Sequence, residues 1–206
     1  TILTSANLSG AYLDGVDLRF KDLTEANLTG ANLINKNLTQ AILTSANLSG
    51  AYLEGVDFTQ TILTSANLSG ANLTDVNLTG KKLKEVKLEG ANLTGANLTG
   101  ANLKNSDLTG TILTSVNLSG ANLDGVDLRN KDLTGTILSG VDLSNKDLTG
   151  VNLKGAKKIE IIVKEPSHSN WPALNELQGL NVTRYDLTGE VQYLTTKEGF
   201  IFESKN

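Results

Sequence analysis

The sequence predicts a solenoid, a rod in which short units stack around one apolar core. From Leu3 to Leu153 every fifth residue is leucine, and Phe58 is the single exception in 31 consecutive positions. Glycine stands two residues after this position in 17 of the 31 units. A period of five fits neither a 3.6-residue helix nor a 2-residue strand, and glycine recurring at one phase marks a turn in every unit. Stacked units of this kind would bury a column of leucines.

Each unit offers two inward side chains, the leucine and a small or β-branched residue two positions earlier. The position between them is mostly Asn or Asp, as at Asn7, Asp17 and Asn27. The residue after the leucine is Thr or Ser in 21 of 31 units. Burying one leucine contributes roughly 1.5–3 kcal/mol, so the leucine column accounts for stability as well as shape.

The units ANLTG-ANLTG-ANLKN at residues 91–105 resemble the pentapeptide-repeat proteins, whose motif is A(D/N)LXX, and the resemblance covers residues 1–155. It implies an all-β solenoid, a right-handed quadrilateral β-helix with four pentapeptides in each 20-residue coil. Thirty-one units would make about 7.75 coils, and at ~4.8 Å per coil the rod would be roughly 37 Å long. One column of the core would then contain Leu3, Leu23, Leu43, Leu63, Leu83, Leu103, Leu123 and Leu143.

Near copies within the repeat show how it duplicated. Residues 1–18, 41–58 and 61–78 are offset by 40 and 20, whereas the copy at 111–128 lies 50 residues after 61–78. Fifty is a multiple of five but not of 20, so duplication followed the pentapeptide and not the coil.

Residues 156–206 depart from the repeat and predict a small α+β C-terminal cap. We expect a strand at 158–164, a short helix near 171–179, and a hairpin of 191–196 with 199–203. This segment would cover the last coil, because an open sheet edge invites aggregation.

The other end of the rod carries no such cap. The chain starts on a complete unit without methionine, so we expect a processed chain or part of a longer one. An end-to-end homodimer through the uncapped N-terminal coil is one hypothesis.

Composition argues against catalysis. The chain has no cysteine, and its one histidine, His168, lies in a Pro/Ser loop with no evident partner. No glycine-rich phosphate loop is present. We therefore expect no enzyme, no catalytic residue, no cofactor and no metal.

Charge and hydropathy also exclude two kinds of partner. A net charge of −4 argues against binding to nucleic acid, and no run approaches the ~18 apolar residues of a membrane span. Composition does not predict a cellular compartment.

Five lysines occupy the inward position that the family normally gives to a small residue. A buried unpaired ammonium is untenable, so either the amine reaches the surface at a corner or the backbone bulges. A buried ionic site is the less favoured alternative. These lysines are Lys21, Lys36, Lys81, Lys131 and Lys146.

Three aspartates, Asp107, Asp127 and Asp147, would stack on one side of a 20-residue coil. Stacked like charges are destabilising. A bound Ca²⁺ could relieve them, but we favour neutralisation by the nearby Arg129 and Lys146.

Exposed apolar residues at the Asn/Asp position are the candidate interaction residues. Ile42 and Ile62 would be neighbours on one side, while Tyr12 and Tyr52 share another side with Asn32 between them. Isolated apolar surface residues are ordinary, but a short ladder could form a contact patch.

The sequence therefore favours a non-catalytic structural or protein-interaction module with an unidentified protein partner. The family suggests an alternative, a DNA-mimicking modulator of DNA gyrase or topoisomerase. Mimicry needs an acidic surface, yet residues 1–155 hold 15 Asp/Glu against 12 Lys/Arg, a net of −3. A third hypothesis is an ice- or surface-binding solenoid, based on a ladder of Thr39, Thr59, Thr79 and Thr99.

Overall fold

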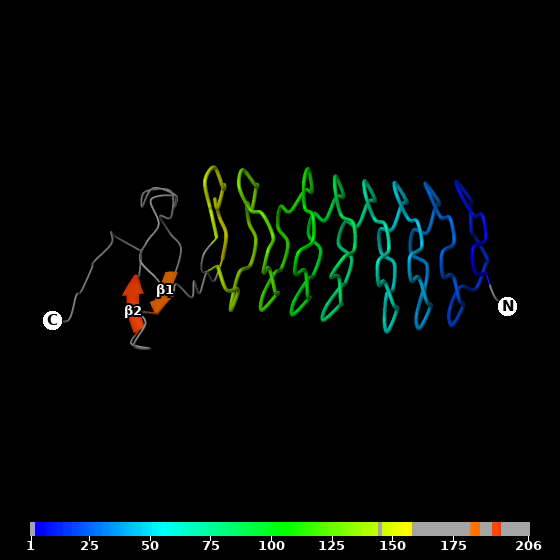
Figure 1. Ribbon diagram of the computed structural model, residues 1–206, viewed down its shortest axis with the longest axis horizontal. Coiled ribbons are helices and arrows are strands. Elements are labelled where there is room, and N and C mark those ends of the chain that lie inside the picture. The colour runs from blue at the N-terminus through cyan, green and yellow to red at the C-terminus, as the bar shows by residue number, and fades with distance from the viewer. Residues whose placement is uncertain (1–2, 144–145, 158–181, 186–190, 195–206) are drawn as a thin grey trace.

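The repeat region is a β-solenoid whose coils stack in chain order, from the blue end to the yellow segment of Figure 1. The computed structural model describes residues 3–143 and 146–157, and the backbone of 182–185 and 191–194. Parallel β-bridges join residues 20 apart, from Asn7–Asn27 through to Ile137–Lys157. Each coil therefore contains four pentapeptides, as the resemblance to the pentapeptide-repeat family implied. The total of about 7.75 coils stays a prediction, because residues 1–2 and 144–145 lie outside the described part.

A tight turn follows every core leucine and gives the coil its corners. In the first described unit the amide of Ala6 donates to the carbonyl of Leu3 at 3.0 Å, and Ser5 has a φ of 55°. Positive φ at the third turn residue alone is the type II pattern. The same corner position has positive φ in 17 glycines and in 13 other residues. Successive corners keep each side short, so the coils are joined by single bridges and not by long strands.

The Asn or Asp before each leucine stabilises the next corner. Asn27 Oδ1, for example, accepts hydrogen bonds from the amide of Thr29 at 3.1 Å and from its hydroxyl at 2.7 Å. Side chains of this type commonly bond the backbone two residues on. Such a bond explains why the repeat combines Asn or Asp with Thr or Ser on either side of the leucine.

The core contains the leucine column together with Ala, Val and a few Thr residues. Seven of the eight leucines named above are buried, and Leu3 is only partly buried. Phe58 is also fully buried, so its ring occupies a leucine position inside the stack.

The described part of the C-terminal segment is a two-stranded antiparallel hairpin. Strand β1 (Val182–Tyr185) pairs with strand β2 (Val191–Leu194), and Tyr185 lies opposite Val191. Strand β2 falls within the predicted strand at 191–196, but its partner here is β1, which the sequence analysis did not predict. The β-branched Val182 and Thr183 favour a strand. The predicted strand 158–164, the helix near 171–179, segment 199–203 and His168 lie outside the described residues, so the capping role stays a prediction.

Two corner glycines separate the backbone cost of a corner from its steric cost. Gly30 (φ +63°) has open space around an added Cβ, whereas a Cβ on Gly125 would overlap Asn105 Oδ1. We expect Gly30→Ala to lower the free energy of unfolding by about 1–2 kcal/mol and Gly125→Ala to lower it further. Urea denaturation measures both.

Removing the overlapping side chain is the control for this pair. Gly125→Ala should lower the free energy of unfolding by more than Gly30→Ala does. Adding Asn105→Gly to Gly125→Ala should restore this extra part of the free energy. Equal losses for the two single variants would contradict the steric part of the explanation.

Candidate interaction surfaces

Four sides run the length of the solenoid, and each is a ladder of outward residues spaced 20 apart. We name each side by its outward residue in the second coil. They are the Asp22, Asn27, Asn32 and Asn37 sides. Adjacent outward residues on one side are one coil apart, ~4.8 Å.

The Asp22 side brings Ile42 and Ile62 together. A parallel bridge joins them, and the amide of Ile62 donates to Ala41 O at 3.1 Å. Ile62 is 46% exposed and Ile42 is half-buried. The predicted contact strip is therefore two residues long, since the next outward residue on this side is Lys82.

The Asn32 side carries Tyr12 and Tyr52, which bridge to Asn32 from its two neighbouring coils. Tyr12 is 81% exposed and Tyr52 is 51% exposed. Ile34, which follows the core leucine of the middle coil, is 40% exposed. The sequence analysis missed Ile34 because it searched only the Asn/Asp position, although an isoleucine where most units have Thr or Ser was a visible signal.

The inward lysines interrupt the ladders next to them. Among the described residues, the bridge to the preceding coil is missing beside Lys36, Lys81, Lys131 and Lys146. The unbridged pairs beside these lysines are Asp17 and Asn37, Ile62 and Lys82, Ile112 and Asp132, and Asp127 and Asp147. Four more described pairs lack a bridge without an inward lysine beside them, namely Asp57 and Asn77, Lys87 and Asp107, Asp107 and Asp127, and Asn122 and Asp142.

At Lys81 and Lys146 the ammonium takes the place of the missing backbone contact. Lys81 Nζ donates to Thr61 O at 3.0 Å, and Lys146 Nζ donates to Val126 O at 2.9 Å and to Leu123 O at 2.6 Å. In intact ladders the equivalent carbonyl accepts from a backbone amide, as Ala26 O does from the amide of Asn47 at 2.9 Å. Burial lowers the pKa of both lysines, and nearby aspartates only partly oppose it.

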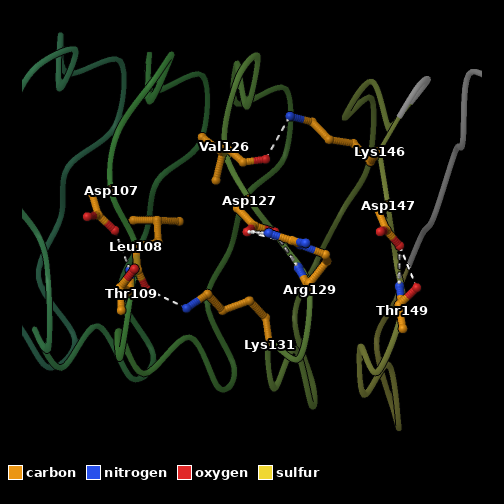
Figure 2. A network of polar contacts seen from close by, with 10 residues as sticks. All are labelled: Asp107, Leu108, Thr109, Val126, Asp127, Arg129, Lys131, Lys146, Asp147 and Thr149. Carbon is orange, nitrogen blue, oxygen red and sulfur yellow. Dashed lines mark hydrogen bonds and ion pairs between the residues drawn. The ribbon is translucent and has the colours of Figure 1, made fainter.

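The stacked aspartates lie on the Asn27 side, and Figure 2 shows them with their neighbouring cations. We call this region the charged groove; it contains Asp107, Asp127, Arg129, Lys131 and Asp147. Arg129 donates from Nε to Asp127 Oδ1 at 3.0 Å and from Nη2 to Oδ2 at 2.6 Å. Asp147 accepts from the amide and hydroxyl of Thr149 at 2.9 and 2.6 Å. Arg129 therefore neutralises Asp127 as predicted, but Lys146 binds backbone carbonyls.

Hydrogen bonding keeps these carboxylates ionised. Bonds from Arg129 lower the pKa of Asp127 to about 2, and bonds from Thr109 and Thr149 lower the pKa values of Asp107 and Asp147. Within the described residues no group of three or more His, Cys, Asp or Glu side chains is arranged to hold a metal ion. The groove thus offers fixed charges of both signs.

Two cavities, of about 390 and 670 Å³, open in this groove where the ladder is interrupted. Asp127 and Arg129 line both. In the described part of the chain no bridge joins Asp127 to Asp107 or to Asp147, so the coils make fewer backbone contacts here. The sequence analysis predicted the stacked charges but not this opening. Lys146 was the signal for the break between Asp127 and Asp147, whereas Val126 precedes Asp127 and gave no signal for the break with Asp107.

The repeating solenoid and its ladders of outward Asn and Asp define the class of protein. The model of the family described as "Pentapeptide repeats" matches eight copies, over residues 1–19, 22–60, 43–80, 82–114, 91–130 and 132–157. The chain belongs to the pentapeptide-repeat family. No curated protein sequence matches it.

Several solved structures are similar. One is HetL of the cyanobacterium Nostoc sp. strain PCC 7120, which is described as involved in the regulation of heterocyst differentiation. HetL is 34% identical to this chain. The match covers 83% of this chain and 77% of HetL, with a TM-score of 0.34. Rfr23 of the cyanobacterium Cyanothece 51142 is 33% identical over 54% of this chain and 63% of its own, with a TM-score of 0.15. QnrB1, described as a plasmid-mediated fluoroquinolone resistance protein, is 18% identical over 77% of this chain and 90% of its own, with a TM-score of 0.38.

The described residues contain no helix of the length and apolarity needed to cross a lipid bilayer.

Stability should fall in acid because hydrogen bonds lower the pKa values of six outward aspartates. The lowered pKa values contribute stability that is present above the ordinary value of 3.8 and is lost as the pH falls toward about 2, the pKa of Asp127. We expect the midpoint of urea unfolding to drop across this interval. The variant Asp127→Asn should show a shallower drop, and an unchanged slope would contradict the assignment. The six are Asp17, Asp22, Asp57, Asp107, Asp127 and Asp147.

Replacing an inward lysine should restore the ladder beside it. Lys146→Ala removes an ammonium whose pKa burial lowers, and it frees Val126 O to accept from the amide of Asp147. We expect higher stability at pH 7 and slower hydrogen exchange of that amide. The outward Lys87 keeps its bridge to Asn67, so Lys87→Ala should stay within about 0.5 kcal/mol of the parent. A less stable Lys146→Ala variant would refute this account.

Proposed function

We propose that the chain is a non-catalytic protein-interaction module, a rigid solenoid that presents flat polar sides to a protein partner. One observation carries this proposal. Large apolar side chains are exposed to solvent at outward positions of the ladders, where backbone hydrogen bonds join one coil to the next. Tyr12, Tyr52, Ile62 and Ile112 are all between 46% and 81% exposed.

Fixed spacing is what makes these side chains useful for recognition. The amides of Tyr52 and Ile112 donate to carbonyls of the preceding coil at 3.0 and 2.9 Å. Side chains held in this way lose little conformational freedom on binding, which lowers the cost of association. Aromatic residues are also enriched at protein interfaces. Residues 1–155 would form the module, with 156–206 as its C-terminal cap.

The charged groove supports the same function on a different side. Its cavities offer Asp107, Asp127 and Arg129 as ion-pairing groups. Charges of both signs at fixed positions favour specificity and rapid association with a complementary protein surface.

No observation favours the two alternatives. A DNA mimic of the kind that would modulate gyrase needs a continuous acidic surface, and here Arg129, Lys131 and Lys146 stand among the aspartates. The threonine ladder expected of an ice-binding surface is also interrupted, because no bridge joins Asp57 to Asn77 in the described structure. A gyrase supercoiling assay and a thermal-hysteresis measurement test these alternatives directly.

Photo-crosslinking from each side tests the proposed module. A photoreactive side chain would replace one outward residue per side, at Ile62, Asp127, Tyr52 or Asn117, in the full chain. We expect a discrete protein adduct from one or two sides, competed by unlabelled chain. Adducts that are absent, or equally weak from all four sides, would contradict the proposal.

Sedimentation velocity tests the end-to-end homodimer separately, and a monomer at high concentration would exclude it.

A further inference from the structure

Three exposed apolar side chains gather on the first three coils at the Asn32 side. They are Tyr12, Ile34 and Tyr52, which we call the tyrosine patch. Tyr12 and Tyr52 are bridged through Asn32, so their backbones lie two coils apart, a separation of ~9.6 Å at ~4.8 Å per coil. Ile34 belongs to the middle coil, beside Asn32.

The backbone fixes this spacing. The amide of Asn32 donates to Ala11 O at 3.0 Å, and the amide of Tyr52 donates to Ala31 O at 3.0 Å. Each tyrosine therefore stands on an intact ladder. A ligand that repeats with the same period could contact both rings without any rearrangement of the solenoid.

A polyproline II helix has that period. It contains three residues per turn and rises 3.1 Å per residue, so equivalent side chains recur every ~9.3 Å. Proline-rich segments bind surfaces lined by aromatic side chains, and their preformed conformation limits the entropy lost on binding. Residues i and i+3 of such a segment would each meet one tyrosine, with Ile34 contacting the turn between them.

The polar groups of the patch also suit this ligand. Asn32 Oδ1 accepts the amide of Ile34 at 3.1 Å, which leaves the side-chain NH₂ group of Asn32 to donate outward. A polyproline II backbone has no internal hydrogen bonds, so its carbonyl oxygens are available as acceptors.

Two acidic residues flank Ile34, and the exposed one sets the charge of the ligand. Asp14 and Glu54 directly follow the core leucine, as Ile34 does, in the coils on either side, and the amide of Asn35 donates to Glu54 O at 2.8 Å. The Asp14 side chain is fully exposed, with Lys36 Nζ 3.9 Å from it. Asn72 donates to one Glu54 carboxylate oxygen, and the other oxygen is buried and has no hydrogen-bond partner among the described residues. Asp14 is therefore the carboxylate of the two that a ligand can reach.

We propose that the tyrosine patch binds a proline-rich protein segment in the polyproline II conformation, with Arg or Lys next to its prolines. This inference rests on the proposed interaction function and names the partner class for one side of the solenoid. The tyrosines supply the apolar contact, Asn32 the hydrogen bond, and the exposed Asp14 the pairing with the basic residue.

Fluorescence anisotropy with the full chain tests the apolar contact. The probes are labelled decaproline carrying two arginines at one end, unmodified decaproline, and a Gly/Ser peptide with the same two arginines. We expect the arginine-flanked decaproline to bind most tightly and the Gly/Ser peptide not to bind. Tyr12→Ala combined with Tyr52→Ala should weaken binding at least tenfold. Ile112→Ala, an exposed apolar residue on the same side but three coils beyond Tyr52, is the matched control and should not change it.

The charge contribution needs a second variant. Asp14→Asn should bring the affinities for arginine-flanked and unmodified decaproline together. Circular dichroism and urea unfolding would establish that each variant is folded.

Several results would overturn the proposal. These are equal binding of the Gly/Ser peptide, no binding of either proline probe, an equal loss in Ile112→Ala, or self-association of the chain that the tyrosine variant abolishes. If the proline probes fail while crosslinks form from another side, the partner assignment is wrong and the interaction function stands. If crosslinking fails on every side as well, both are wrong.

Discussion

The left-handed corner after every core leucine is the constraint on which the rest of the structure depends. All 30 described corner residues have positive φ, and 13 of them are not glycine. Each corner ends a side after a few residues, so no long strand can form within the repeat and pairing occurs only between successive coils. Non-glycine residues accept this conformation at a cost of order 1 kcal/mol or more each. The leucine column and the contacts between coils offset that cost.

Corner geometry also limits what neighbouring coils can contain. Four described corners have Asn or Asp, and in every case glycine occupies the corner one coil later, where a Cβ would overlap the carboxamide or carboxylate oxygen. The inward lysines impose a second limit, since the bridge to the preceding coil is missing beside Lys36, Lys81, Lys131 and Lys146. The outer surface is thus a consequence of interior packing, and cavities open where inward polar groups compete for backbone carbonyls.

Periodicity predicted the buried leucine column, because it depends only on spacing. The 20-residue coil, and with it the adjacency of Ile42 and Ile62, came from the resemblance to the pentapeptide-repeat family. Neither predicted which carbonyl the Lys146 ammonium would reach, because a long side chain has many conformers and the period does not select one. The 20-residue coil predicted stacked charges at Asp107, Asp127 and Asp147 but not the missing bridges between them. In the C-terminal segment the strand β2 was expected but its pairing with β1 was not, since short segments of similar β propensity offer several pairings.

The missing bridges also record how the repeat was duplicated. Between one pair of coils, two adjacent sides lack a bridge, namely Asp57 to Asn77 and Ile62 to Lys82. The other two sides keep theirs, Tyr52 to Asn72 and Asn67 to Lys87. Fifty residues later, at Asp107 and Asp127 and at Ile112 and Asp132, the open sides are the opposite two. Because 50 residues is two and a half coils, duplicating this stretch placed the second pair of open sides on the opposite face of the solenoid. A single duplication event in units of five residues therefore accounts for the position of both breaks.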